Sequence, residues 1–247
     1  MTEMAPPRIL PVGDCAVSVQ FGEIVDLSIN ARVLALDRSL TAAALPGVVE
    51  MVPTYRSLLI HFDPLQISAA ALETAIHRCL VEGAPSGTAA SEGRQWQVPV
   101  GYGGEFGMDL SDLAGRHGLS EEAIVATHSS ATYHVYMIGF APGFAYLGGL
   151  PERLKTPRRS EPRMLTPAGS VSIGGAQSAV ASVPLPSGWH MIGRTPFASF
   201  DPSRDPVFLF RPGDVIRFTA IGPADWYSLA GRLQRGEIVP QPEGRCA

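Results

Sequence analysis

Apolar and polar residues alternate with two different periods in the first eighty positions of the chain. Between Cys15 and Phe21, apolar residues alternate with smaller or polar ones, which is the pattern of a half-buried strand. From Ile29 to Leu40, apolar positions are spaced by four, three and four residues, so a helix is predicted there with Asp26 as its cap. Two further strands and a second helix are predicted at 48–52, 55–62 and 67–80. This order predicts a small domain whose helices cover one face of an antiparallel sheet.

The pattern changes after a run of small residues, APSGTAASEG, at positions 84–93, which we interpret as a flexible linker. Alternation resumes over residues 96–100, which predicts the strand that opens the second part of the chain. The segment 109–130 predicts two short helices, with Asp109 and Ser120 as their N-caps.

From Tyr133 onward, short apolar runs are separated by glycine and proline, a pattern typical of a closed barrel or a sandwich. The turn RPGD at 211–214 predicts a hairpin between VFLF and DVIRF, and residues 224–236 predict a terminal helix. Other strands are predicted at 133–139, 169–175, 178–183 and 189–193. The predicted fold class is therefore α+β, with an N-terminal domain at residues 1–88 and a β-barrel domain with a terminal helix at residues 94–247.

Charge and composition exclude several classes of protein. The net charge is −4, so the chain lacks the positive field with which proteins bind nucleic acid. No apolar run approaches the roughly 20 residues that cross a bilayer, and no secretory signal is visible, so we expect a cytoplasmic protein without a membrane partner. The cysteines Cys15, Cys79 and Cys246 form no CxxC pair, and the histidines lack metal-binding spacing. We predict no metal held by this chain.

No familiar catalytic spacing occurs, so the catalytic residue is unknown from the sequence. Three segments nevertheless carry candidate chemistry. The first, GFAPGFAYLGG at 139–149, mixes glycine and Pro142 with the rings of Phe140, Phe144 and Tyr146. We interpret it as a connection leaving a barrel strand, in which the rings either line a pocket or plug the end of the barrel.

The second segment, ERLKTPRRSEPR at 152–163, gathers five basic and two acidic residues in an acidic protein. Arg158, Arg159 and Arg163 lie among prolines that restrict the backbone, and arginine is suited to a two-pronged contact with carboxylate or phosphate. The alternative is a solvated run of surface charge. The prolines make the loop backbone rigid, and this favours the binding interpretation, because a loop that is only solvated does not require a rigid backbone.

The third candidate combines TPAGSVSIGGAQ at 166–177 with SGWHMIGRTP at 187–196. Backbone N–H groups of a glycine-rich turn around Ser170 could hold an anion, with Gln177 as a neutral donor and Arg194 as a charge. The alternative is that the glycines mark strand bulges. His128 completes the candidate site residues, although a histidine on the apolar side of a helix is more often a hydrogen-bonded core residue than a base or a ligand.

The motifs of the second half, taken in order, resemble a known family. The N-terminal stretches GDCAVSVQFG at 13–22 and VPTYRSLLIHFD at 52–63 resemble the same family, so the resemblance covers the whole chain. On these residues the sequence is similar to the family of 5-oxoprolinase B subunits, also called the Kip inhibitor or allophanate hydrolase subunit 1 family. The motifs that carry the resemblance are GFAPGFAYLGGLP (139–151), TPRRSEPR (156–163), PAGSVSIGGAQ (167–177), GWHMIGRTP (188–196) and RPGDVIRF (211–218).

The resemblance implies a small N-terminal α+β domain followed by a cyclophilin-like β-barrel. It implies a component of a complex that opens 5-oxo-L-proline to L-glutamate with ATP hydrolysis, inactive alone and paired with the C subunit, a homologous barrel protein, and with the A subunit. ATP would be the cofactor of the complex, at a place the sequence does not reveal. The alternatives within the family are a regulator that inhibits a sensor histidine kinase and a component of urea and allophanate degradation.

Overall fold

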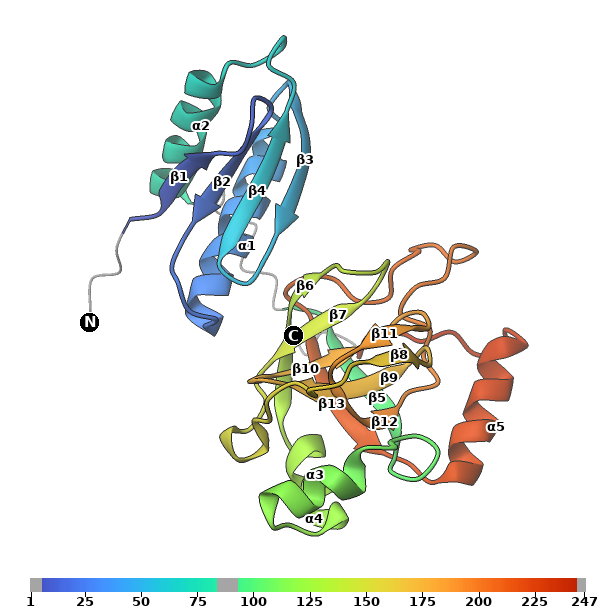
Figure 1. Cartoon of the computed structure of the whole chain (residues 1–247). Coiled ribbons are helices and arrows are strands. Elements are labelled where there is room, and N and C mark those ends of the chain that lie inside the picture. Colours follow the sequence, from blue (N-terminus) through green and yellow to red (C-terminus); the bar gives the residue numbers. More distant parts are fainter. Residues whose placement is uncertain (1–5, 84–92, 244–247) are drawn as a thin grey trace. The chain divides into compact units, whose positions relative to one another are not determined.

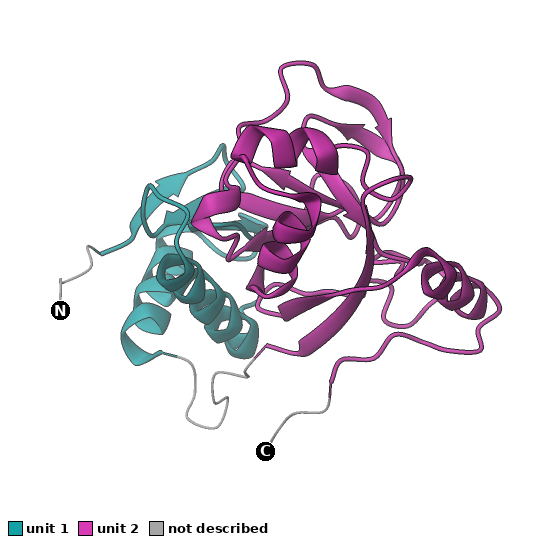
Figure 2. Cartoon of the chain, turned by 90° about the horizontal axis from the view of Figure 1, so that it is seen from below, with its two compact units in different colours: residues 1–92 teal, residues 93–247 magenta. Residues whose placement is uncertain are grey.

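The computed structural model describes residues 6–83 and 93–243, and the chain divides into two compact units, residues 1–92 and 93–247 (Figure 2). Most of the predicted linker, residues 84–92, lies outside the described residues. We propose domain limits of 1–88 and 94–247.

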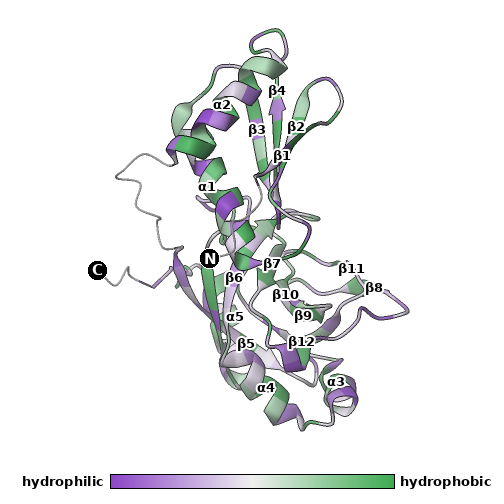
Figure 3. Ribbon diagram, turned by 90° about the vertical axis from the view of Figure 1, so that its left-hand side faces the viewer, coloured by the Kyte–Doolittle hydropathy of each residue, from purple (hydrophilic) through white to green (hydrophobic). Residues whose placement is uncertain are grey.

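In the described part of the first unit, antiparallel strands form a sheet in the order β1–β2–β4–β3. Helices α1 and α2 lie on the same side of this sheet (Figures 1 and 3). The predicted order of strands and helices is confirmed, with one strand more at the start, β1. The elements are β1 (Arg8–Pro11), β2 (Ala16–Gln20), α1 (Leu27–Ala43), β3 (Val48–Pro53), β4 (Ser57–Phe62) and α2 (Ala69–Glu82).

Local sequence explains these elements. The Asp26 carboxylate accepts hydrogen bonds from the backbone N–H groups of Ser28 and Ile29, at 2.8 and 3.2 Å, and so begins α1 as predicted. The apolar side of α1 packs against the alternating apolar positions of β2 and β4, which is why both periods appear in the sequence. The buried residues of this core include Val17, Val19, Ile29, Val33, Leu36, Leu40, Leu58, Ile60, Leu72 and Ile76.

In the second unit, described strands close into a barrel in the order β10–β7–β6–β13–β5–β12–β9. Strand β13 lies parallel to β5 and antiparallel to β6. The strands are β5 (Gln95–Tyr102), β6 (Thr132–Ile138), β7 (Ala145–Gly148), β9 (Ser170–Gly174), β10 (Gln177–Val180), β12 (His190–Arg194) and β13 (Val215–Ala220). The predicted α+β fold with a barrel is confirmed.

Other elements surround the barrel strands (Figure 1). Strands β8 and β11 form a separate antiparallel pair, and the terminal helix is present as predicted. None of the described helices is long and apolar enough to cross a membrane. These elements are α3 (Leu110–His117), α4 (Glu121–Ser129), the short 3-10 helix η1 (Glu152–Leu154), β8 (Arg163–Thr166), β11 (Leu185–Ser187) and α5 (Pro223–Gln234).

Two sequence predictions in this unit are wrong. The predicted hairpin between residues 207–210 and β13 does not form, because β5 and β6 occupy both edges of β13. Leu209 and Phe210 instead bury their side chains in the barrel core. The segment 139–149 is not only a loop, since its second half is strand β7, which pairs with β6 and β10. Ala145 and Leu147 point into the core, whereas Tyr146 belongs to a separate apolar cluster.

Candidate functional site

The arginine loop, residues 156–163, is anchored to the barrel by a buried carboxylate. Asp109 stands at the start of α3 as predicted, but within the described residues its side chain makes no capping bond. Its oxygens accept hydrogen bonds from Arg159 at 2.9 Å and from two nitrogens of Arg163 at 2.5 Å. They also accept the backbone N–H of Met191, on β12, at 2.8 Å. Asp109 is thus the N-cap residue by position, as predicted, but its carboxylate does not cap the helix, because the arginines and Met191 take its oxygens.

The electrostatics of Asp109 follow from these contacts. Burial by itself would raise its pKa, but hydrogen bonds from Arg163 and Met191 and the charges of both arginines outweigh burial, so the pKa is lowered. The side chain is 3% exposed, and those of Arg159 and Arg163 are 26% and 23% exposed. These two arginines are thus held by an internal partner, which leaves them poorly suited to bind an external anion.

The remaining arginine of the loop has a different environment. Arg158 is exposed, and its guanidinium lies over the ring of Trp189, 5.6 Å from the centroid. Burial raises the pKa of Tyr146, and the charge of Arg158 acts against that rise, which places the guanidinium close to this phenol as well. A cation on an aromatic surface, open to solvent, can accept a carboxylate or a phosphate.

The rings of the first candidate segment form a row that ends at this cation. Phe140 contacts Phe144 with ring centroids 5.8 Å apart, and Phe144 contacts Tyr146 at 4.8 Å. Tyr146 then contacts Trp189 at 6.0 Å. Phe144 and Trp189 are buried, whereas Phe140 is 73% exposed. Pro142 is exposed in the same turn. We call the row Phe140–Phe144–Tyr146–Trp189 the aromatic wall; it brings the first two candidate segments together.

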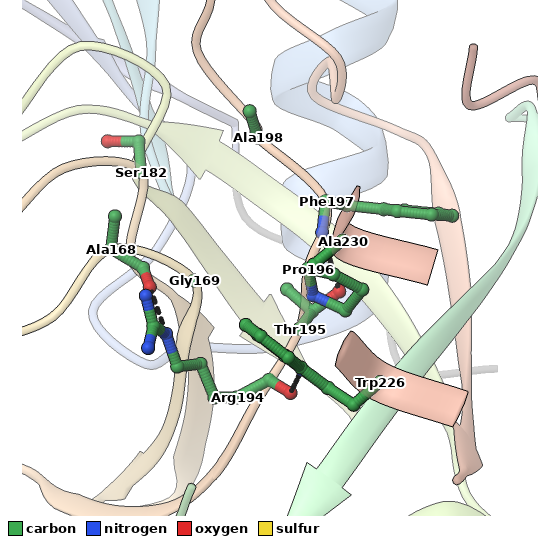
Figure 4. A pocket seen from close by; sticks show the side chains of 10 residues that line it. All are labelled: Ala168, Gly169, Ser182, Arg194, Thr195, Pro196, Phe197, Ala198, Trp226 and Ala230. Atoms are coloured by element: carbon green, nitrogen blue, oxygen red, sulfur yellow. Dashed lines mark hydrogen bonds between the residues drawn. The ribbon is translucent and has the colours of Figure 1, made fainter. Parts of the chain in front are cut away.

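A second place in this unit is concave. A hollow of about 130 Å³ lies among the end of β12, the loop before β9 and helix α5 (Figure 4). Arg194 donates from Nε to the carbonyl oxygen of Ala168 at 2.8 Å, and its guanidinium lies 5.2 Å from the ring centroid of Trp226. The indole N–H of Trp226 donates to the carbonyl oxygen of Arg194 at 2.8 Å. The lining residues are Ala168, Gly169, Ser182, Arg194, Thr195, Pro196, Phe197, Ala198, Trp226 and Ala230.

The glycine-rich segment 166–177 is mostly strand and not an anion-binding turn. The N–H groups of Gly169, Ser170 and Gly175 donate to backbone carbonyls, so they are already engaged. The Ser170 hydroxyl is buried and donates to the carbonyl of Pro167 at 2.6 Å. Gln177 is half-buried at the start of β10. Ser170 lies directly opposite Arg194 in the pairing of β9 with β12, but its hydroxyl is engaged by Pro167. Gln177 pairs with Gly174 at the other end of β9, so the three residues do not form the predicted anion-binding turn.

His128 lies in the closed interior of the barrel. It is fully buried, stacks on Phe218, and its ring nitrogens lie 2.9 Å from the Tyr102 hydroxyl and 3.2 Å from the Ser178 hydroxyl. Burial lowers the pKa of His128 to about 3, so the ring stays neutral. A neutral histidine with both nitrogens engaged stabilises the core, and we place it outside the candidate site.

The residues that sequence reasoning missed share one property: each acts through a contact distant in sequence. The sequence indicates for Asp109 a role in its own helix only, and it indicates no role for Trp189 or Trp226. No local signal pointed to Asp109, because an arginine requires a carboxylate partner only when it is half-buried, and burial is decided by the fold. In the described residues, no group of three or more histidine, cysteine, aspartate or glutamate side chains could hold a metal ion.

Comparison with known proteins identifies relatives along nearly the entire chain. A family model described as carboxyltransferase domain, subdomain C and D, matches residues 7–210. A protein of Escherichia coli O157:H7, named as the B subunit of 5-oxoprolinase, is 39% identical over 244 residues, which cover 98% of this chain and all of that protein. One of Bacillus subtilis (strain 168) with the same name is 37% identical over 231 residues, covering 90% and 95%.

Solved structures resemble the fold. The crystal structure of TTHA0988 has a TM-score of 0.75 and 37% identity over 84% of this chain, which spans 40% of that longer chain. The Kluyveromyces lactis urea amidolyase has a TM-score of 0.78 over 98% of this chain and 16% of its own, at 20% identity. At that identity the likeness shows a shared fold alone.

Proposed function

The chain belongs to the family of 5-oxoprolinase B subunits, and from this premise we propose that it is one component of an enzyme that opens 5-oxo-L-proline to L-glutamate with hydrolysis of ATP. The observation that carries the proposal is the 39% identity that spans all of the E. coli protein. We also propose its partners, a homologous barrel protein, which is the C subunit, and a third protein, the A subunit.

The chemistry of a lactam indicates what the site must contain. The amide is resonance-stabilised, so water attacks it slowly at neutral pH, and ATP would supply the phosphoryl group that activates the carbonyl oxygen. The protein must then hold negative charge on the substrate carboxylate and on phosphate. Among the described candidate arginines, Arg158 on the aromatic wall and Arg194 at the hollow have no carboxylate partner and are open to such anions. Asp109 does not itself contact the anion in this proposal; it holds the loop that positions Arg158.

The openness of the aromatic wall supports a site shared between chains. Phe140 is 73% exposed at one end of the wall and Arg158 is exposed at the other. A reaction with an activated phosphorylated carbonyl needs exclusion of water, which an open surface does not provide. The sequence also lacks a phosphate-binding loop motif. We therefore propose that partner proteins cover the wall and hold ATP, and that this chain is inactive alone.

The direct test is 5-oxoproline-dependent ATPase activity, measured for this chain alone, with the candidate A and C subunits, and for the partners without it. We expect turnover only when all three are present. Arg158→Gln should lower the activity of the assembled enzyme at least about tenfold, because one charge-assisted contact is lost. Arg217→Gln, which removes an exposed charge on β13, is the matched control and should leave activity unchanged. Full activity of this chain alone would sink the shared-site proposal.

A regulatory role is the second candidate from the family resemblance, since docking on a sensor histidine kinase needs only a surface. Affinity capture of the tagged chain from its own cells distinguishes the enzyme subunit from the regulator. Recovery of the A and C subunits supports the enzyme, whereas recovery of a kinase in their place supports the regulator.

A further inference from the structure

Arg194 is held firmly on one side and is open on the other. Its Nε is fixed by the carbonyl of Ala168, and its guanidinium plane is supported by the ring of Trp226 (Figure 4). Among the described residues, no hydrogen bond or ion pair engages its two terminal nitrogens. The guanidinium therefore presents unused donors in a fixed position, which lowers the entropy that a ligand must overcome on binding.

This arrangement differs from that of three other half-buried arginines in the same unit, Arg94, Arg159 and Arg163. Arg94 bonds the carboxylate of Asp214 at 2.6 Å, and Arg159 and Arg163 bond that of Asp109. Arg194 has no such carboxylate in the described part of the chain. A planar guanidinium binds a carboxylate through two parallel hydrogen bonds. The carboxylate of a ligand could therefore pair with Arg194 as Asp214 and Asp109 pair with their arginines.

The rest of the hollow favours a ligand that is uncharged apart from its carboxylate. Of its described lining residues, Arg194 alone carries a charge, and Pro196, Phe197, Ala198, Trp226 and Ala230 offer apolar surface. A carboxylate entering the hollow meets one cation and no lining anion. The remainder of the molecule meets mostly carbon, with the hydroxyl groups of Ser182 and Thr195 also in the lining, which favours a compact ring over a second charge.

The size of the hollow limits the ligand further. Its volume of about 130 Å³ is small beside the roughly 300–1,000 Å³ of pockets for drug-sized molecules. A nucleotide is therefore too large, and a molecule of one small ring with one carboxylate is the right class.

From the open guanidinium, the uncharged walls and the volume, we propose that the Arg194 hollow is a binding site for a small cyclic carboxylate, with the carboxylate on Arg194 and the ring against Trp226. The choice of 5-oxo-L-proline as its ligand rests on the proposed function. The site belongs to this chain alone, which distinguishes it from the aromatic wall that partners are proposed to cover.

The experiment is titration calorimetry of the full chain, without partners, using 5-oxo-L-proline, its neutral carboxamide and inorganic phosphate as probes. We expect the wild-type chain to bind 5-oxo-L-proline, and the carboxamide to bind at least about tenfold more weakly because it lacks the anion. Arg194→Gln should weaken 5-oxo-L-proline binding by a similar factor. Ala230→Leu, which keeps the cation and fills the hollow from α5, should also abolish binding.

Arg232→Gln is the matched control, because it removes an exposed charge from the same helix outside the hollow lining. It should bind like the wild type, and circular dichroism should verify that every variant is folded. Absence of binding to the wild-type chain, equal binding to Arg194→Gln, or binding of phosphate in preference to 5-oxo-L-proline would each overturn the proposal. Arg194-dependent binding by a chain whose assembled complex lacks oxoprolinase activity would instead refute the proposed function and keep this site.

Discussion

The arginine loop and the end of β12 use the same side chain in opposite ways. In the loop, two of three arginines bond the buried Asp109, so these two cations share one carboxylate of the same chain. At the end of β12 a single arginine, Arg194, faces an uncharged hollow. The contrast teaches that the density of charge along a sequence does not locate an anion site. What decides is whether the fold brings a carboxylate to each cation.

The largest effect should come from removing the carboxylate on which the loop depends. Asp109→Ala leaves Arg159 and Arg163 half-buried without their partner, which should lower the free energy of unfolding by about 3–5 kcal/mol. Urea denaturation measures this. Asp112→Ala, which breaks an exposed pair with Arg116 on the same helix, should cost less than about 1 kcal/mol. Similar losses in the two variants would contradict the buried role of Asp109.

The second prediction concerns the backbone beside Arg194. Gly169 has a φ of +79°, and a Cβ there would lie 2.2 Å from the carbonyl oxygen of Thr195. Gly169→Ala should therefore destabilise the protein by about 2–3 kcal/mol, from backbone strain together with overpacking. Gly175 has a φ of +63° with open space around it, so Gly175→Ala should cost only about 1 kcal/mol from strain. Thermal unfolding compares the stability of the two variants. Equal losses would show that the backbone around Gly169 moves to accommodate the added methyl group.

The third prediction separates two neighbouring arginines. Arg159→Gln removes a charge-assisted hydrogen bond to a buried carboxylate and should cost about 2 kcal/mol of unfolding free energy. Arg158→Gln loses an exposed contact with Trp189 and should cost less than about 1 kcal/mol. Denaturant titration of both variants provides the measurement. If Arg158→Gln destabilised the protein more than Arg159→Gln, Arg158 would have a structural role, which would contradict the proposal that it is open to an anion.

The smallest effect is a pH dependence. Because the pKa of Asp109 is lowered in the folded state, its contribution is complete above the ordinary carboxyl pKa of about 3.9 and is lost as pH falls through the lowered value. The difference in unfolding free energy between wild type and Asp109→Asn should therefore shrink with acid, by at most about 1.4 kcal/mol per pH unit. His128, whose pKa burial lowers to about 3, titrates in both proteins and cancels.

Urea denaturation between pH 2 and pH 6 measures that difference. Asp112→Asn serves as the control, because its carboxylate is half exposed in a surface pair, and its difference from wild type should stay nearly constant. A constant difference for Asp109→Asn as well would show that the ion pair does not couple to protonation.

Much of the fold follows from the sequence, because its signals are local. The two periods of the first unit predicted its helices and its central strands, and Asp26 and Ser120 cap the helices expected of them. Strand β7 was hidden because glycine and proline surround it, although Ala145 and Leu147 already alternate with Tyr146. Residues 207–210 have the composition of a strand, but both edges of β13 were occupied by strands from elsewhere.

By itself, the sequence determined the fold class, the places of most elements and the candidate arginines, since periodicity, caps and turns are properties of neighbouring residues. Only the tertiary structure decided which arginines are open. Arg159 and Arg163 meet Asp109 across 50 and 54 residues, and Asp109 meets Met191 across 82. Trp189 and Trp226 likewise gain their roles under Arg158 and Arg194 through folding. The physical reason is that pairing of buried charge depends on distances in space, which no local pattern encodes.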